Sequence, residues 1–190
     1  MHLCSAKCEL LPENCLPQKK KKEKSMELFD TADYTKMTAE ELSALFDDDL
    51  FEAVVERTEQ KVDGFERWSD GVNSLNPAQR LFYSVYWLDA EVNNGGLCQF
   101  LTNSSRVFAP VVSRYMEKIG ATDHQKLYDG FLSENNIDPN DLSSFDISTV
   151  EDYVNQYQRY PFDEYDNAFG NLETLETYLV AFIREHINDF

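Results

Sequence analysis

Hydrophobic residues recur along most of this chain at intervals of three and four, the spacing that places them on one face of an α-helix. One such series is Leu81, Phe82, Val85, Leu88 and Val92. The final stretch repeats the pattern with Leu172, Leu175, Leu179, Phe182, Ile183 and Ile187. Because no stretch of useful length alternates apolar and polar residues, we predict an all-α fold, a single compact domain of about seven to nine helices.

Polar residues mark the points where several of these helices should begin. Pro77 suits the first position of a helix, where its missing N–H would have no partner, and Gly120 suits a helix end. The expected cap residues are Thr38 with Glu41, Asp48 or Asp49, Asn76 with Gln79, and Ser104 or Ser105. These starts and ends divide the chain into short helices joined by turns.

The most informative stretch is residues 91–105, where two adjacent glycines interrupt a strongly apolar helical pattern. Each glycine costs about 1 kcal/mol inside a helix relative to alanine, so the chain should turn there. Polar side chains around the turn are expected to converge at a helix–helix junction: Glu91, Asn93, Asn94, Gln99 and Asn103 beside Gly95 and Gly96. Two interpretations stay open, a corner whose amides satisfy freed backbone groups and a site for a small ligand.

A set of short motifs is spread over residues 91–187. They are Glu91, Asn94-Gly95-Gly96, Gln99-Phe100, Asn103-Ser104-Ser105, Ile119-Gly120-Ala121, the segment from Phe162 to Asp166, Phe169, and the segment from Leu175 to Ile187. This set resembles the signature of a family of small, mostly bacterial helical domains, long catalogued as a domain of unknown function, that includes an acidic DNA-mimic protein. The similarity extends over residues 38–190. The resemblance implies a non-enzymatic protein that binds a DNA-binding protein in place of DNA, and it suggests a homodimer.

Residues 1–25 differ from the rest of the chain. They hold six lysines against three glutamates, so we expect a basic, disordered tail ahead of an acidic all-α domain at residues 26–190. The tail cysteines, Cys4, Cys8 and Cys15, lack the spacing of a zinc site, and no metal or other cofactor is expected. The chain has neither a signal-peptide core nor an apolar run of about 18 residues, so we expect a cytoplasmic location and no membrane association. The scattered histidines are expected at the surface: His2, His124 and His186.

The net charge is strongly negative and unevenly distributed. It is −18 for the whole chain, and residues 26–190 carry 32 acidic and 11 basic side chains. Residues 27–70 hold 14 acidic and 4 basic side chains, residues 71–133 hold 5 of each, and residues 134–190 hold 13 and 2. A net charge of roughly 2–8 suffices to keep a small domain soluble, so the excess suggests a phosphate-like surface as an alternative to solubility alone.

These features support three functional hypotheses. The first is a non-enzymatic protein that binds the basic surface of a DNA-binding protein, such as a transcription regulator, and excludes DNA without binding nucleic acid itself. Its expected contact residues are Asp47, Asp48, Asp49, Glu52, Glu56 and Glu59 on one flank, and Asp163, Glu164 and Asp166 on the other. The second is an enzyme or ligand-binding protein that uses the glycine corner, although no catalytic residue is assigned. The third is an immunity or antitoxin-like protein that neutralises a basic toxin.

Overall fold

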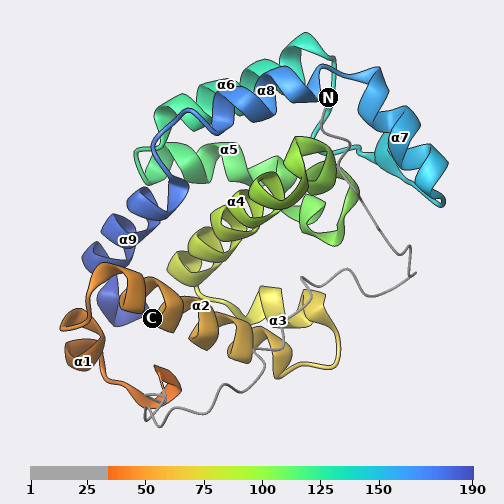
Figure 1. Ribbon diagram of the computed structural model, residues 1–190. Helices are drawn as coiled ribbons and strands as arrows, with labels where there is room; N and C mark the ends of the chain where they lie inside the picture. The colour runs from red at the N-terminus through yellow and green to blue at the C-terminus, as the bar shows by residue number, and fades with distance from the viewer. Residues whose placement is uncertain (1–33) are drawn as a thin grey trace, which may run out of the picture.

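The computed structural model describes residues 34–190, which fold into nine α-helices and four short 3-10 helices without a β-strand (Figure 1). The α-helices are α1 (Ala39–Ser43), α2 (Asp47–Asp63), α3 (Trp68–Ser74), α4 (Pro77–Thr102), α5 (Ala109–Lys118), α6 (Thr122–Glu134), α7 (Val150–Arg159), α8 (Phe162–Phe169) and α9 (Leu175–Glu185). The 3-10 helices are η1 (Tyr34–Lys36), η2 (Ser104–Phe108), η3 (Ser143–Phe145) and η4 (Ile187–Asp189). The all-α prediction is confirmed. The predicted tail and its boundary at residue 25 lie outside the described residues.

Helix α4 forms the centre of the molecule. It packs against α2, α5, α8, α9 and η2, and the remaining helices surround this group (Figure 1). Its predicted apolar stripe is buried, and Phe82, Val85 and Leu88 have no exposed surface. Helices α6 and α8 lie on one side of α4 and helices α2 and α3 on the other, while α7 projects from one end. No helix among the described residues combines the length and apolar character needed to cross a membrane.

Both predicted capping boxes are present. The backbone N–H of Glu41 donates to Thr38 Oγ1 at 3.2 Å, and that of Gln79 donates to Asn76 Oδ1 at 2.8 Å. In each box the side chain at the third helical position also accepts a hydrogen bond from the backbone N–H of the cap residue. Gly120 has a φ of +84° just after α5, as expected of a glycine that ends a helix.

Other predicted helix starts are wrong. Helix α2 begins at Asp47 with Phe46 as its N-cap, so neither Asp48 nor Asp49 is the cap. All three aspartates lie in the first turn, where negative charge is favoured by the helix dipole. Ser104 and Ser105 lie inside η2, and neither side chain caps a helix.

One histidine also departs from the prediction. His124 is buried, because its ring packs against the rings of Phe169 and Tyr178 instead of facing solvent. Burial lowers the pKa of His124, which favours the neutral imidazole in the folded protein.

Candidate functional site

The two glycines produce a sharp kink inside α4. Gly95 and Gly96 have non-helical backbone angles, and Gly96 has φ +78° and ψ −179°, a conformation essentially limited to glycine. A Cβ atom on Gly96 would lie 2.0 Å from Oδ2 of Asp166, and one on Gly95 would lie 2.1 Å from Oε1 of Gln99. Gly96 therefore requires glycine for its backbone conformation, whereas a side chain at Gly95 would have to displace the side chain of Gln99.

The carboxylate of Glu91 is the centre of a hydrogen-bond cluster at this kink. Its Oε2 accepts from Nε2 of Gln99 at 2.6 Å and from Nδ2 of Asn103 at 2.9 Å. Its Oε1 accepts from the hydroxyl of Ser105 at 2.8 Å. Glu91 is only 4% exposed, so the three donors replace the water that a buried carboxylate would lose. The cluster joins the two halves of α4 and η2.

The predicted convergence at this corner holds for only part of the expected set. Asn93 and Asn94 are exposed, and Nδ2 of Asn93 donates to Oδ1 of Asp89 instead of joining Glu91. The amide donors of Gln99 and Asn103 are directed at Glu91, where the sequence interpretation expected backbone partners or a ligand. The geometry of the corner is therefore that of a structural joint.

Asp166 belongs to this joint as well. Its Oδ1 accepts from the backbone N–H of Leu97 at 2.8 Å, which satisfies a donor that the kink frees. Burial raises the pKa of Asp166, and the hydrogen bond from Leu97 opposes that shift. Asp166 was expected among the partner-contacting acids, but its carboxylate is directed inward from α8 to α4.

Acidic side chains form a continuous row on α2. Asp49, Glu52, Glu56, Glu59 and Asp63 follow one another at intervals of three and four residues, and we call this row the acidic stripe. Glu59 is partly exposed and the other four are exposed. The opposite face of α2 is buried in the core through Leu50, Ala53, Val54, Thr58 and Val62. The helical period therefore places the acids together on the outer face.

The basic residues of α2 are held away from this stripe. Nη1 of Arg57 donates to the carbonyls of Tyr34 at 3.2 Å and Met37 at 2.6 Å, and its Nη2 donates to the carbonyl of Phe190 at 3.3 Å. Nζ of Lys61 donates to Oε1 of Gln79 at 2.8 Å. These partners are backbone carbonyls and a side-chain amide outside the stripe. The negative charge of the stripe is therefore not neutralised by Arg57 or Lys61.

The remaining candidates of this flank have different roles. Nε of Arg184 donates to Oδ1 of Asp47 at 2.9 Å, and the same guanidinium donates to the carbonyls of Ser43 and Leu45. Asp47 is therefore engaged in tying α9 to the α1–α2 turn. Asp48 is exposed beside the start of the stripe.

The kink lies in a region that matches a known protein family. A family model described as DMP19-like protein matches residues 73–186, which include the whole of α4 and the Glu91 cluster. The chain belongs to the DMP19-like protein family. The match is shorter than the similarity over residues 38–190 expected from the motifs, and it begins after α2. Searches of curated proteins and of solved structures give no match.

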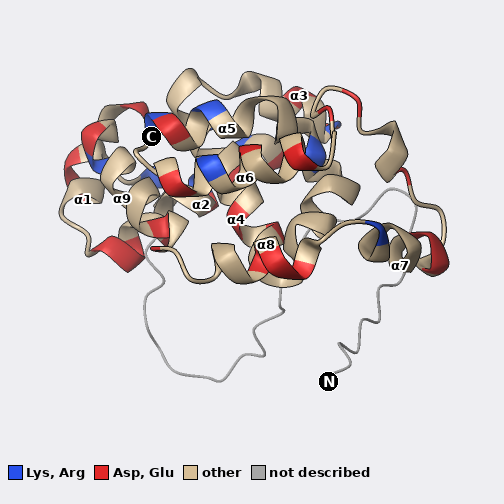
Figure 2. Ribbon diagram, turned by 90° about the horizontal axis from the view of Figure 1, so that it is seen from above, with Lys and Arg blue, Asp and Glu red and all other residues tan. Residues whose placement is uncertain are grey.

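The second acidic flank of this DMP19-like protein lies apart from the stripe. Asp163 and Glu164 are on α8, which packs on a different side of α4 from α2 (Figure 1). Oδ1 of Asp163 accepts from the hydroxyl of Tyr157 at 2.5 Å, whereas Glu164 is exposed. Acidic residues also occur on other helices, including the far end of α7 (Figure 2). The stripe on α2 is the place where the structure aligns the expected acids.

Two residues that contribute to these sites, Asp63 and Ser105, were not among the site residues expected from the sequence. Asp63 extends the stripe by one helical turn, and its position four residues after Glu59 was the signal that would have included it. Ser105 completes the Glu91 cluster, but its partner lies 14 residues away, so no local pattern indicated the bond. Among residues 34–190, no three histidine, cysteine or carboxylate side chains are grouped closely enough to hold a metal ion.

Proposed function

We propose that this DMP19-like protein is a non-enzymatic DNA mimic. In this proposal the acidic stripe of α2 binds the basic, DNA-contacting surface of a DNA-binding protein in the cytoplasm and excludes DNA from it. The observation that carries the proposal is the exposed row of carboxylates on α2, with Arg57 and Lys61 bonded elsewhere. Membership of the DMP19-like family supports the same role.

The spacing of the stripe is comparable to that of phosphates on DNA. Residues three and four apart on a helix are separated by about 4.5–6 Å along its axis, because the rise is about 1.5 Å per residue. From Asp49 to Asp63 the stripe therefore extends about 21 Å with a charge roughly every 5 Å. One DNA strand carries a charge every ~3.4 Å, so the stripe is a somewhat sparser row of the same sign. Flexible lysine and arginine side chains can adjust to that difference.

The two acidic flanks imply two separate surfaces in one molecule. Helices α2 and α8 lie on different sides of α4, so Glu164 and the stripe do not present a single face. A homodimer, which the family resemblance suggests, would be one way to align acidic surfaces of two copies. We include a homodimer in the proposal, and sedimentation equilibrium of the purified chain would test it.

The decisive experiment combines capture with competition. The immobilised protein is incubated with lysate of its source cells at low salt, and bound proteins are released with rising NaCl or with duplex DNA. We expect a basic protein that both treatments release, and that loses its own DNA in a mobility-shift assay when this protein is added. Capture of a protein that does not bind DNA would contradict the mimic proposal and favour neutralisation of a basic toxin.

A matched pair of variants tests the stripe itself. One variant carries Glu52→Gln, Glu56→Gln and Glu59→Gln, and the control carries the same change at three exposed acids outside the stripe: Glu117, Glu151 and Glu185. Both lose three negative charges. We expect only the stripe variant to lose the captured DNA-binding protein, and equal loss in the two variants would show that net charge alone is responsible.

A further inference from the structure

The acidic stripe forms the rim of a groove between α2 and α4. The groove has a volume of about 720 Å³. Phe51 and Val55 of α2 and Tyr86 of α4 supply its apolar surface, and Glu52, Glu56 and Glu59 supply the acidic rim. Phe51, Val55 and Tyr86 are each partly exposed, so the described residues leave apolar surface open beside the carboxylates.

This combination of surfaces fits lysine side chains. A lysine has an apolar four-carbon stem that can lie along Phe51, Val55 and the ring of Tyr86, and an ammonium group that can reach the carboxylate rim. The face of an aromatic ring such as that of Tyr86 also attracts an ammonium ion. Several lysines in succession would place one cation near each of several carboxylates.

The chain itself contains such a run. Lys19, Lys20, Lys21 and Lys22 are consecutive, and Lys24 follows. The described part of the chain begins at Tyr34, beside α2, because Arg57 of α2 bonds the Tyr34 carbonyl and the charges of Asp49, Glu52 and Glu56 act on the Tyr34 side chain. The lysine run therefore precedes a residue that already lies next to the stripe.

The connection between the run and α2 is long enough to reach the groove. Lys22 lies twelve positions before Tyr34, a span of at most about 40 Å when extended and of about 20 Å as a flexible coil. The stripe itself is about 21 Å long. A linker of this size also gives a high effective concentration of the lysines near the groove.

We propose that Lys19–Lys22 dock in the α2–α4 groove of the same chain and occupy the acidic stripe until a basic partner displaces them. The protein then carries its own competitor for the surface. The docking itself requires no partner. Only the displacement of the lysines by a basic partner rests on the proposed function.

A spin label tests the contact in the full chain. Cys4→Ser and Cys8→Ser leave Cys15 as the site for a nitroxide label close to the lysine run, because Cys98 is fully buried and its pKa is raised to about 12 by burial. Paramagnetic broadening of backbone amide signals is then measured at about 20 mM and about 500 mM NaCl, where the Debye length falls from about 20 Å to about 4 Å. We expect broadening along α2 at low salt and its loss at high salt.

Matched variants identify the groups involved. Substituting all four lysines (Lys19→Gln, Lys20→Gln, Lys21→Gln and Lys22→Gln) should abolish the broadening along α2, and so should the stripe variant with Glu52→Gln, Glu56→Gln and Glu59→Gln. The control with Glu117→Gln, Glu151→Gln and Glu185→Gln should keep it. Amide spectra of each variant without the label show whether the fold is retained, and all substituted positions in the described residues are partly or fully exposed.

Several outcomes would overturn the proposal. Broadening that falls on α7 or α8 instead of α2, or that persists in the four-lysine variant, excludes the proposed contact. Broadening found only in a mixture of labelled and isotope-enriched chains places the lysines on a second copy. If the contact on α2 is observed but no DNA-binding protein is captured, the proposed function fails and this inference stands. If capture succeeds and α2 shows no broadening, only this inference fails.

Discussion

At the scale of single residues, the contacts of each side chain explain which residues occur around the kink. Gly96 requires glycine because of its positive φ and the close carboxylate of Asp166. The buried carboxylate of Glu91 accepts from three donors, of which Ser105 is buried and Gln99 and Asn103 are partly buried. These contacts stabilise the joint between the two halves of α4, so changes here should affect folding more than binding.

Gly96→Ala should destabilise the protein by about 2–4 kcal/mol, because the backbone conformation is unfavourable for alanine and the new methyl group would collide with Asp166. Gly130→Ala is the matched control. Gly130 lies inside α6, and a Cβ atom there would meet no other atom within 4 Å. That change should stabilise the protein by about 0.4–1 kcal/mol. Urea unfolding of both variants measures the change in the free energy of unfolding. A Gly96→Ala variant as stable as the unchanged protein would contradict the described kink.

Glu91→Leu should cost about 3 kcal/mol or more, because it leaves the Gln99, Asn103 and Ser105 donors without their acceptor in a buried site. Glu91→Gln should cost much less, since its carbonyl oxygen can keep both amide donors and the Ser105 hydroxyl can turn to accept. Denaturant unfolding gives both values. Two equally stable variants would contradict the structural role given to the Glu91 carboxylate.

At the scale of elements, α2 and α4 show how helix faces divide between packing and charge. On α2 the acidic stripe places like charges four residues apart, as in Glu52 with Glu56, and such pairs destabilise a helix by roughly 0.2–0.5 kcal/mol each. The three aspartates of the first turn act in the opposite direction through the helix dipole. The cost of the stripe is consistent with a surface retained for binding.

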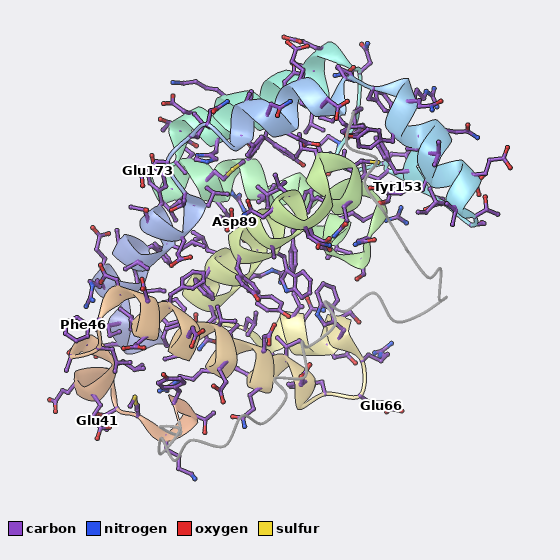
Figure 3. The ribbon with its side chains drawn as sticks, viewed as in Figure 1. Glu41, Phe46, Glu66, Asp89, Tyr153 and Glu173 are labelled. Atoms are coloured by element: carbon purple, nitrogen blue, oxygen red, sulfur yellow. The ribbon has the colours of Figure 1, made fainter. Side chains whose placement is uncertain are left out.

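The packing of α4 against α9 creates a pH-dependent contribution to stability. Asp89 of α4, labelled in Figure 3, is partly buried, and the negative charge of Glu176 of α9 acts on it. Burial, assisted by Glu176 and opposed by the bond from Asn93, raises the pKa of Asp89 to about 6. Because this pKa is raised in the folded state, Asp89 contributes stability below its ordinary pKa of 3.8 and loses it as the pH rises through about 6.

Asp89→Asn should therefore stabilise the protein at pH 7.5 by about 1–2 kcal/mol, a figure reduced from the full shift because the side chain is partly exposed. The gain should shrink towards zero at about pH 3, below the ordinary pKa of 3.8, where the carboxyl is neutral in both the folded and the unfolded protein. Thermal unfolding at both pH values provides the measurement, with Asp48→Asn as an exposed control. A gain independent of pH would show that Asp89 is not desolvated as described.

At the scale of the whole molecule, function depends on where negative charge accumulates. The chain has a large acidic excess, and among the described residues its acids are distributed over several helices (Figure 2). Four of the expected acids, Asp49, Glu52, Glu56 and Glu59, follow one another in a row on α2. The family match covers the kink and excludes α2, so the proposed binding surface depends on the geometry of this chain rather than on the matched region.

Binding of the captured DNA-binding protein should be governed by this charge. Association should slow and affinity should fall steeply as salt rises. Replacing Glu52, Glu56 and Glu59 by glutamine should weaken binding by about tenfold or more at low salt and flatten the salt dependence, because each exposed ion pair contributes roughly 0.2–1 kcal/mol. Surface plasmon resonance over a salt series measures both effects. Unchanged salt dependence in this variant would remove the stripe from the interface.

The sequence by itself determined the local features of the protein. The spacing of apolar residues predicted the all-α fold, Thr38 and Asn76 marked two helix starts, and the glycine pair located the break in α4. It also showed that the acidic excess lies outside residues 71–133. These features depend on backbone propensity, capping and helical period, which involve residues only a few positions apart.

The tertiary structure alone decided which polar side chains face solvent. Arg57 is turned away from the stripe by a carbonyl 133 residues distant, Asp166 is drawn to the Leu97 N–H 69 residues away, and Asn93 and Asn94 are left outside the cluster. The same packing separates α8 from α2. A polar group that loses water on folding needs another hydrogen-bond partner. The arrangement of the helices determines which partners lie close enough, and a local sequence pattern does not contain that information.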